Sequence, residues 1–190
     1  MCERKHYYSY GEKLQGKVIS EALIRGNVGH STLAAYYQAL KDGKTRDTAM
    51  DLAIDVLWSE TEFYSNELFD KDKFITDLGF LIQNYWDNYV DDDMQILEVE
   101  VLHTIQLTDT FEMPVKIDLL ARIPGRGIIA IDFKFCYDFF NVDKLDLSPQ
   151  LPKYMAALRE MGIKVDGIMY DELRYRSTKD NEADRSLKFR

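Results

Sequence analysis

Two aspartates and a lysine lie on either side of a sharp turn in the second half of the 190-residue chain. Asp118 precedes the run Pro124-Gly125-Arg126-Gly127, and Asp132 and Lys134 follow it. A turn of three residues, 124–126, would form a β-hairpin in which Asp118 faces Asp132. Because side chains alternate along a strand, Lys134 would share the side of Asp132. We therefore predict two carboxylates and one ammonium group close together.

Two neighbouring carboxylates repel each other, and a shared divalent cation relieves the repulsion. Oxygen ligands suit Mg²⁺ or Mn²⁺, which retain water and accept phosphate oxygens. A bound metal lowers the pKa of its water, and an adjacent lysine can orient that water and stabilise charge on the phosphate. This set of residues indicates phosphodiester hydrolysis. Taken alone, however, Asp-x-Lys is better explained by an exposed ion pair between Asp118 and Lys134, worth about 0–1 kcal/mol.

The same register also predicts which apolar side chains of the hairpin share a face. The facing pairs would be Ile117 with Phe133, Leu119 with Ile131, and Ala121 with Ile129. We expect these six side chains to form one continuous apolar face, which a slip of one residue would disrupt.

The elements around the hairpin follow from hydrophobic periodicity. Apolar residues recur at three- and four-residue spacing over residues 17–91, which predicts helices with breaks at 42–44 and around 70–72. From about residue 94 the period changes to two, which predicts strands as far as Phe135.

A further helix and strand are expected after the hairpin. Ser148 is a typical N-cap and Pro149 a typical first helical residue, so we predict a helix from there to about Met161, ending at Gly162. A short strand over residues 165–170 follows.

We expect a single α/β domain over residues 1–190, with a central mixed β-sheet flanked by helices and a helical N-terminal portion. Residues 1–93 would be mainly helical, 94–170 would form the catalytic core, and 171–190 would form a polar tail.

Composition excludes several classes of protein. Hydrophobic residues make up 46% of the chain, which is typical of a globular domain rather than a disordered one. Cys2 and Cys136 cannot form a disulfide framework, no signal peptide is recognisable, and no apolar run approaches the roughly 20 residues of a membrane span. We expect no membrane association and a location in the cytoplasm.

The net charge of −9 is unevenly distributed. Residues 47–112 contain 17 acids and two bases, which gives −15, whereas the rest of the chain has 22 bases and 16 acids, which gives +6. The beginning and the second half of the chain could therefore meet a polyanion such as DNA.

Three short segments occur in an order typical of one nuclease family. They are Val115-Lys116-Ile117-Asp118, Ile131-Asp132-Phe133-Lys134 and Gln150-Leu151-Pro152-Lys153-Tyr154. This order resembles the catalytic core of PD-(D/E)XK nucleases of the RecB-like exonuclease branch, whose members share a restriction-endonuclease-like core.

Two N-terminal segments extend the resemblance, which spans about residues 2–170. Arg25-Gly26-Asn27-Val28-Gly29-His30 resembles the glycine-and-histidine helix motif of this family. Cys2-Glu3-Arg4-Lys5 resembles the family's Cys-x-Arg-Lys opening, which often anchors an iron–sulfur cluster.

The resemblance implies a role for each matching residue. His30, Asp118 and Asp132 would be metal ligands, the backbone carbonyl of Phe133 a further ligand, and Lys134 the catalytic lysine. Gln150 and Tyr154, four residues apart on one helix face, would support the site or contact the DNA backbone. The family's acidic residue before the first aspartate matches Glu100, and Glu98, with the same strand parity, is the competing candidate.

The chain departs from the family pattern at several positions. Val115 and Lys116 replace a usual Gly-Arg or Gly-Lys, and Phe135 stands where threonine or serine is common. The three later cysteines of cluster-containing relatives are absent, so we expect no iron–sulfur cluster, with Cys2 a remnant of the motif or a free thiol. His6 and His103 match no family motif, and we expect both to be structural or surface residues.

The resemblance implies a metal-dependent DNA exonuclease that acts on DNA ends or single strands in recombination, repair, or CRISPR-associated or phage DNA processing. A recombination or CRISPR protein is a candidate partner, and the bacterial host cytoplasm is the expected location if the chain is phage-encoded. The alternatives are a non-catalytic nucleic-acid-binding or assembly module and a structure-specific endonuclease. Digestion polarity and oligomeric state stay open.

Overall fold

The computed structural model describes residues 4, 7–12, 19–64, 69–89, 93–138 and 150–175. Its elements are, in chain order, η1 (Tyr7–Gly11), α2 (Glu21–Lys41), α3 (Arg46–Glu62), α4 (Lys71–Tyr89), β1 (Gln95–Thr108), β2 (Phe111–Ile123), β3 (Gly127–Cys136), α5 (Gln150–Glu160) and β4 (Gly167–Arg174). The predictions for Cys2, His6, Ser148 and Pro149 lie outside the described residues.

The helices of the N-terminal half begin at residues whose side chains cap the backbone. Ser20 accepts a hydrogen bond from the Leu23 backbone N–H at 3.3 Å, and Thr45 does the same for Thr48. These caps satisfy N–H groups that have no partner within the helix. The predicted break at 42–44 is confirmed, since α2 ends at Lys41 and α3 starts at Arg46. The second break comes earlier than the predicted 70–72, since α3 ends at Glu62 and α4 already starts at Lys71.

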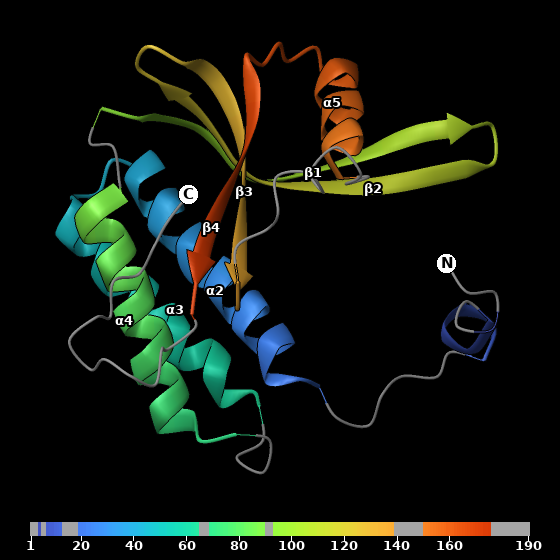
Figure 1. Ribbon diagram of the computed structural model, residues 1–190. Coiled ribbons are helices and arrows are strands. Elements are labelled where there is room, and N and C mark those ends of the chain that lie inside the picture. The colour runs from blue at the N-terminus through green and yellow to red at the C-terminus, as the bar shows by residue number, and fades with distance from the viewer. Residues whose placement is uncertain are drawn as a thin grey trace.

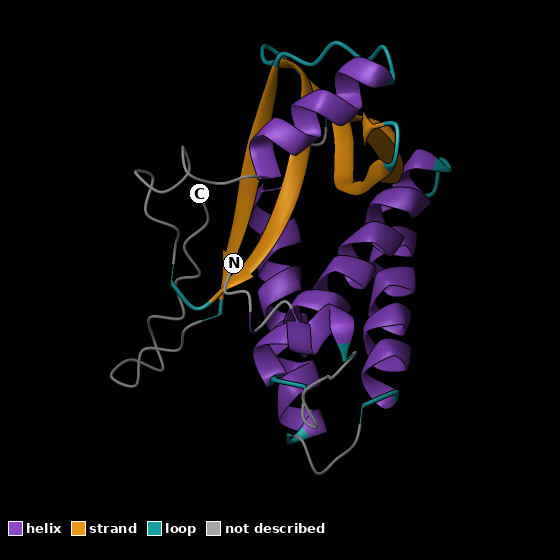
Figure 2. Cartoon of the chain, turned by 90° about the vertical axis from the view of Figure 1, so that its right-hand side faces the viewer, coloured by secondary structure: helices purple, strands orange, loops and turns teal. Residues whose placement is uncertain are grey.

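The strands form one mixed sheet in the order β1-β2-β3-β4. Strand β2 pairs antiparallel with β1 and with β3, whereas β4 runs parallel to β3. Helices α2, α3 and α4 cover one side of the sheet, and α5 lies on the other side, beside the β1–β2 hairpin (Figures 1 and 2). The predicted α/β architecture with a helical N-terminal portion is confirmed.

The turn between β2 and β3 has the predicted length. Ile123 pairs with Gly127, so residues 124–126 form the loop, and the predicted pairs Leu119–Ile131 and Ala121–Ile129 are present. Gly127 has a φ of 85°, and a Cβ there would come within 2.1 Å of Asp166 Oδ2, so only glycine fits.

The predicted register does not continue beyond Leu119. The paired ladder of β2 and β3 ends at Leu119–Ile131. Ile117 packs in the hydrophobic core beside α5, whereas Phe133 packs in the larger core beside α2 and α4. The prediction that both belong to one continuous apolar face is therefore wrong.

The cause is a change of face in the β1–β2 hairpin. Val99 and Leu119 pack with the larger core, whereas Val101 and Ile117, two residues further along each strand, pack with the core beside α5. Between Val99 and Val101, Glu100 has a φ of 54° and lies in the left-handed region, which interrupts the alternation of side chains. The hairpin consequently leaves the rest of the sheet and projects beside α5 (Figure 1).

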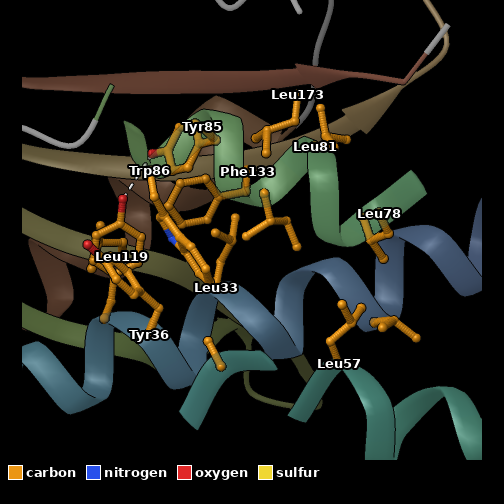
Figure 3. Close-up of a cluster of buried hydrophobic side chains, with 14 of the residues drawn as sticks. Leu33, Tyr36, Leu57, Leu78, Leu81, Tyr85, Trp86, Leu119, Phe133 and Leu173 are labelled. Atoms are coloured by element: carbon orange, nitrogen blue, oxygen red, sulfur yellow. Dashed lines mark hydrogen bonds between the residues drawn. The ribbon is translucent and has the colours of Figure 1, made fainter. Parts of the chain in front are cut away.

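The larger core joins α2, α3 and α4 to β2, β3 and β4. Figure 3 shows its aromatic part, where Tyr85 and Trp86 of α4 lie beside Phe133 of β3. The Tyr36 ring stacks on Trp86 with centroids 4.7 Å apart. Large buried aromatic rings contribute much of the stability of a domain of this size, so this core fixes α2 against the strands.

The end of the described chain and the lengths of the helices bear on two further expectations, a polar tail from residue 171 and no membrane span. Strand β4 runs through Arg174, so residues 171–174 belong to the sheet rather than to a tail. No helix in the described segments is long and apolar enough to cross a membrane.

Candidate active site

Asp118 and Asp132 lie where β2 and β3 separate. Beyond Leu119–Ile131, β3 continues beside β4, while β2 continues beside β1. At this fork Asp118 Oδ2 accepts a hydrogen bond of 2.8 Å from the backbone N–H of Phe133. The carboxylate thus satisfies a buried donor that no longer has a partner in the β2–β3 ladder. The two aspartates meet through the backbone of β3 rather than as a facing pair.

His30 reaches the fork from α2. Its Nδ1 lies 3.2 Å from Asp118 Oδ2. The helix comes close at this point because Gly29 has no side chain: a Cβ there would approach the Phe135 ring to 2.3 Å. The Phe135 ring also meets the His30 ring edge to face, with centroids 5.8 Å apart. Phe135, a departure from the family pattern, therefore fills the space that Gly29 leaves.

Asp132 is almost fully buried, with 1% of its surface exposed. Its Oδ1 accepts hydrogen bonds from Gln150 Nε2, at 2.7 Å, and from the Tyr154 hydroxyl group. Gln150 and Tyr154 lie one turn apart on α5, and Nε2 of Gln150 also donates to the Tyr154 oxygen at 2.6 Å. The structure thus brings both predicted helix residues onto the same carboxylate.

Lys134 contacts the second oxygen of this carboxylate. Its Nζ forms an ion pair with Asp132 Oδ2, a buried oxygen that accepts no hydrogen bond of good geometry. The prediction that Lys134 shares the side of Asp132 is confirmed. The alternative ion pair between Lys134 and Asp118 is not found, because Asp118 is bound to His30 and Phe133.

Burial and charge act in opposite directions on this carboxylate. Burial raises the pKa of Asp132, while the positive charge of Lys134 and the Tyr154 hydroxyl group lower it, and the charge of Asp118 raises it slightly. Burial, together with the hydrogen bond to Asp132, also raises the pKa of Tyr154, which therefore stays a neutral donor. A cation near Asp132 favours its ionised form.

The two candidate glutamates lie in different places. Glu100 falls opposite Asp118, between the pairs Val99–Leu119 and Val101–Ile117, and forms an ion pair with Lys116. Glu98 instead pairs with Lys41 at 2.6 Å. Lys41 lies eleven residues after His30 on α2, about 16 Å along the helix. The position of Glu100 is therefore the nearer one to Asp118.

Phe133 is held by its ring on the opposite side of the sheet. The ring stacks on Tyr37 of α2, with centroids 5.6 Å apart and an interplanar angle of 10°, and meets Tyr85 of α4 edge to face. These contacts fix the backbone between Asp132 and Lys134. The role of the Phe133 carbonyl as a metal ligand stays a prediction.

The side chains at the fork are suitable ligands for a divalent cation, but they do not form a complete coordination site. Asp118, Asp132 and His30 are the side chains of suitable chemistry, and the buried Asp132 Oδ2, which accepts no hydrogen bond of good geometry, is in contact with the Lys134 ammonium group. Within the described residues, no group of three or more His, Cys, Asp and Glu side chains is arranged to hold a metal ion.

One residue that touches this site, Tyr170, was not identified from the sequence. Tyr170 of β4 lies opposite Asp132 in the parallel register, its ring is 5.2 Å from Lys134 Nζ, and its hydroxyl group is 3.4 Å from Gln150 Oε1. The available signal was topological: a strand that follows a crossover helix lies parallel to the strand before it. The remaining histidine of the described segments, His103, pairs with Glu160 at 3.1 Å and joins β1 to α5, as expected of a structural residue.

Comparison with known proteins gives two results. No curated protein matches the chain. A family model described as the PD-(D/E)XK nuclease superfamily matches residues 1–187. The mixed four-stranded sheet flanked by helices is consistent with a restriction-endonuclease-like fold, and membership of this superfamily implies nuclease activity. The chain therefore belongs to the PD-(D/E)XK nuclease superfamily.

Proposed function

We propose that this chain is a Mg²⁺- or Mn²⁺-dependent deoxyribonuclease of the RecB-like exonuclease branch. The observation that carries the proposal is the contact of Lys134 with the buried carboxylate of Asp132, at the fork where Asp118 meets His30. A buried carboxylate and an ammonium group on one strand, beside a second carboxylate, suit the hydrolysis of a phosphodiester.

Asp118 and Asp132 would hold the cation, with His30 and the backbone carbonyl of Phe133 completing the set. When bound, the cation would lower the pKa of a coordinated water and neutralise charge on the phosphate. Gln150 and Tyr154 keep Asp132 Oδ1 in place through their hydrogen bonds. The protein thereby fixes the direction of the carboxylate before the substrate arrives.

Lys134 would act on the substrate directly. Its side chain is 26% exposed, so the ammonium group can reach a phosphate while it stays beside Asp132. There it would donate hydrogen bonds to the phosphate oxygens and orient the attacking water. Without the substrate, Asp132 holds the same ammonium group close to its working position.

The proposed substrate is DNA with an end or a single-stranded segment, processed in recombination, repair, or a CRISPR-associated or phage pathway in the cytoplasm. Charge supports a polyanionic partner only on part of the molecule. The −15 of residues 47–112 disfavours DNA there, while the remaining residues, which include the site, sum to +6.

End-labelled single- and double-stranded DNA, incubated with Mg²⁺, Mn²⁺ or EDTA, tests the proposal. We expect shortening of linear substrates that EDTA abolishes, and no cleavage of covalently closed circles. Cleavage of the circles would instead identify a structure-specific endonuclease. Binding without any cleavage would identify a non-catalytic nucleic-acid-binding module.

Cation binding can be measured without turnover. Mg²⁺ should raise the melting temperature of the wild type by mass action, but not that of Asp118→Asn or Asp132→Asn. In the absence of metal, the melting temperature of each variant is its own baseline, because either substitution removes repulsion between the two acids but also weakens the contact with Lys134 or with His30. Asp77→Asn on α4, which breaks an exposed ion pair with Lys73, is the matched control. A similar Mg²⁺ effect in all four proteins would argue against a cation at the fork.

The two glutamates form a second matched pair. If Glu100 supports the site, Glu100→Gln should lower the cleavage rate about tenfold, the lower end of effects for residues behind the metal ligands. Glu98→Gln, which breaks only the pair with Lys41, should leave the rate unchanged. The opposite ranking would transfer the role to Glu98.

A further inference from the structure

Tyr170 lies on the site face of β4, next to Asp132. The parallel pairing of β3 with β4 places Tyr170 beside Asp132 and Glu172 beside Lys134. The neighbouring residue Asp171 points the other way, since its carboxylate accepts a hydrogen bond from Tyr85 of α4. Tyr170 therefore shares its face with both charged groups of the site.

The ring of Tyr170 contacts the lysine. Lys134 Nζ lies 5.2 Å from the ring centroid, within the range of a cation–π interaction. The same ammonium group touches Asp132 Oδ2. The ring and the carboxylate thus hold Lys134 from two directions.

The hydroxyl group of Tyr170 contacts the amide of Gln150. It donates a long hydrogen bond of 3.4 Å to Gln150 Oε1, while Nε2 at the other end of the amide donates to Asp132 Oδ1 at 2.7 Å. If the amide were turned over, Oε1 would face Asp132 Oδ1, and two acceptors would oppose each other. The Tyr170 hydroxyl group, as a donor to Oε1, therefore favours the amide orientation in which Gln150 Nε2 donates to Asp132.

We infer that Tyr170 is a positioning residue of this site, which sets the Lys134 ammonium group through its ring and the Gln150 amide through its hydroxyl group. It thereby acts on both neighbours of the Asp132 carboxylate, one at each oxygen. The inference deepens the proposed nuclease function and rests on it for its effect on cleavage, whereas the two contacts themselves can be measured in an inactive protein.

Kinetics separate the ring from the hydroxyl group. Tyr170→Leu removes both and should lower kcat about 10–100-fold, as for other residues that orient a site from behind, with little change in KM. Tyr170→Phe keeps the ring and should lower kcat roughly two- to tenfold, the loss of one hydrogen bond. Tyr64→Leu and Tyr64→Phe, at a half-buried tyrosine packed against the larger core, are the matched controls and should leave kcat unchanged.

Spectra of protein labelled with ¹³C-lysine test the lysine contact without cleavage, with Lys134→Ala to assign the resonance. The ring should shift the Lys134 side-chain signals upfield in the wild type and in Tyr170→Phe, but not in Tyr170→Leu. A Lys134 signal identical in all three proteins, or a kcat unchanged in Tyr170→Leu, would overturn the inference.

These measurements distinguish failure of the proposed nuclease function from failure of the inference about Tyr170. A wild type that cleaves no DNA contradicts the proposed function, while the lysine spectrum still decides the contact. If Tyr170→Leu does not fold, Tyr170→Phe decides, and a kcat equal to that of the wild type would overturn the inference.

Discussion

The two ends of the β2–β3 pair differ in how they satisfy the backbone. From Leu119–Ile131 to the turn, strand pairs with strand and the side chains on the helical side are buried and apolar. One residue beyond, the strands separate, and the carboxylate of Asp118 takes the Phe133 N–H. The polar site therefore lies at the point where strand pairing ends, because a freed backbone donor requires an acceptor there.

Two carboxylates on neighbouring strands, one on each face of the sheet, differ in the groups that surround them. Asp132 faces the site and meets Lys134, whereas Asp171 faces the helices and meets the Tyr85 hydroxyl group, which in turn lies 2.9 Å from that of Tyr37. Burial raises the pKa of both, and that of Asp171 to about 6. The charge of Lys134 thus favours the ionised form of Asp132. Burial and the charge of Glu172 disfavour the ionised form of Asp171.

Removal of Lys134 should separate activity from stability most clearly. Lys134→Ala should lower kcat roughly 10²–10³-fold, the effect of losing one group that stabilises the transition state. Its effect on folding is reported by the denaturation midpoint, which should fall only modestly, because Asp132 loses its ion-pair partner but burial raises its pKa, so that the carboxyl group can take up a proton instead. Lys73→Ala, at an exposed lysine paired with Asp77 on α4, is the control. Equal activity of wild type and Lys134→Ala would remove Lys134 from the mechanism.

Substitution in the paired part of the β2–β3 ladder should instead reduce stability. Leu119 is fully buried at the last pair of the ladder, so Leu119→Ala should reduce the free energy of unfolding by about 2–5 kcal/mol. Leu102→Ala on β1, where the side chain is 71% exposed, should change it by less than about 0.5 kcal/mol. Chemical denaturation measures both. Similar losses of unfolding free energy in the two variants would contradict the contrast between the buried β2–β3 ladder and the exposed β1–β2 hairpin.

Two glycines of α2 test how closely His30 is brought to the fork. A Cβ at Gly29 would meet the Phe135 ring, whereas one at Gly26 would meet nothing within 4 Å. Both changes to alanine gain helix propensity, so the difference in unfolding free energy isolates the clash, about 1–3 kcal/mol against Gly29→Ala. Equal stability of the two variants would show that Phe135 moves aside without cost.

A last test concerns Asp171 and pH. Burial raises its folded-state pKa to about 6 from the ordinary value of 3.8, so its contribution to stability is present below about pH 4 and is lost as the pH rises through 6. Asp171→Asn cannot ionise, and its stability relative to the wild type should therefore increase between pH 4 and 6 and then level off. Thermal melts across this range measure the effect. A constant difference would show that Asp171 keeps an ordinary pKa.

Much of this fold could be predicted from local pattern. The breaks between α2, α3 and α4 follow from turn-forming residues, and the loop at 124–126 follows from its glycines. Both features depend on neighbours in the chain, which a sequence displays directly. Gln150 and Tyr154 were identified from a motif, and helix spacing explains why both reach one carboxylate.

The sequence by itself determined the types of element, the hairpin turn and the side of the strand that Asp132 and Lys134 share, because each depends on a period of two or 3.6 residues. Only the tertiary structure decided that β2 leaves β3 at Asp118, that Ile117 joins a different core, and that Tyr170 lies beside Lys134. These features depend on strand twist, on the conformation of Glu100 and on contacts between distant segments, and no local period encodes them.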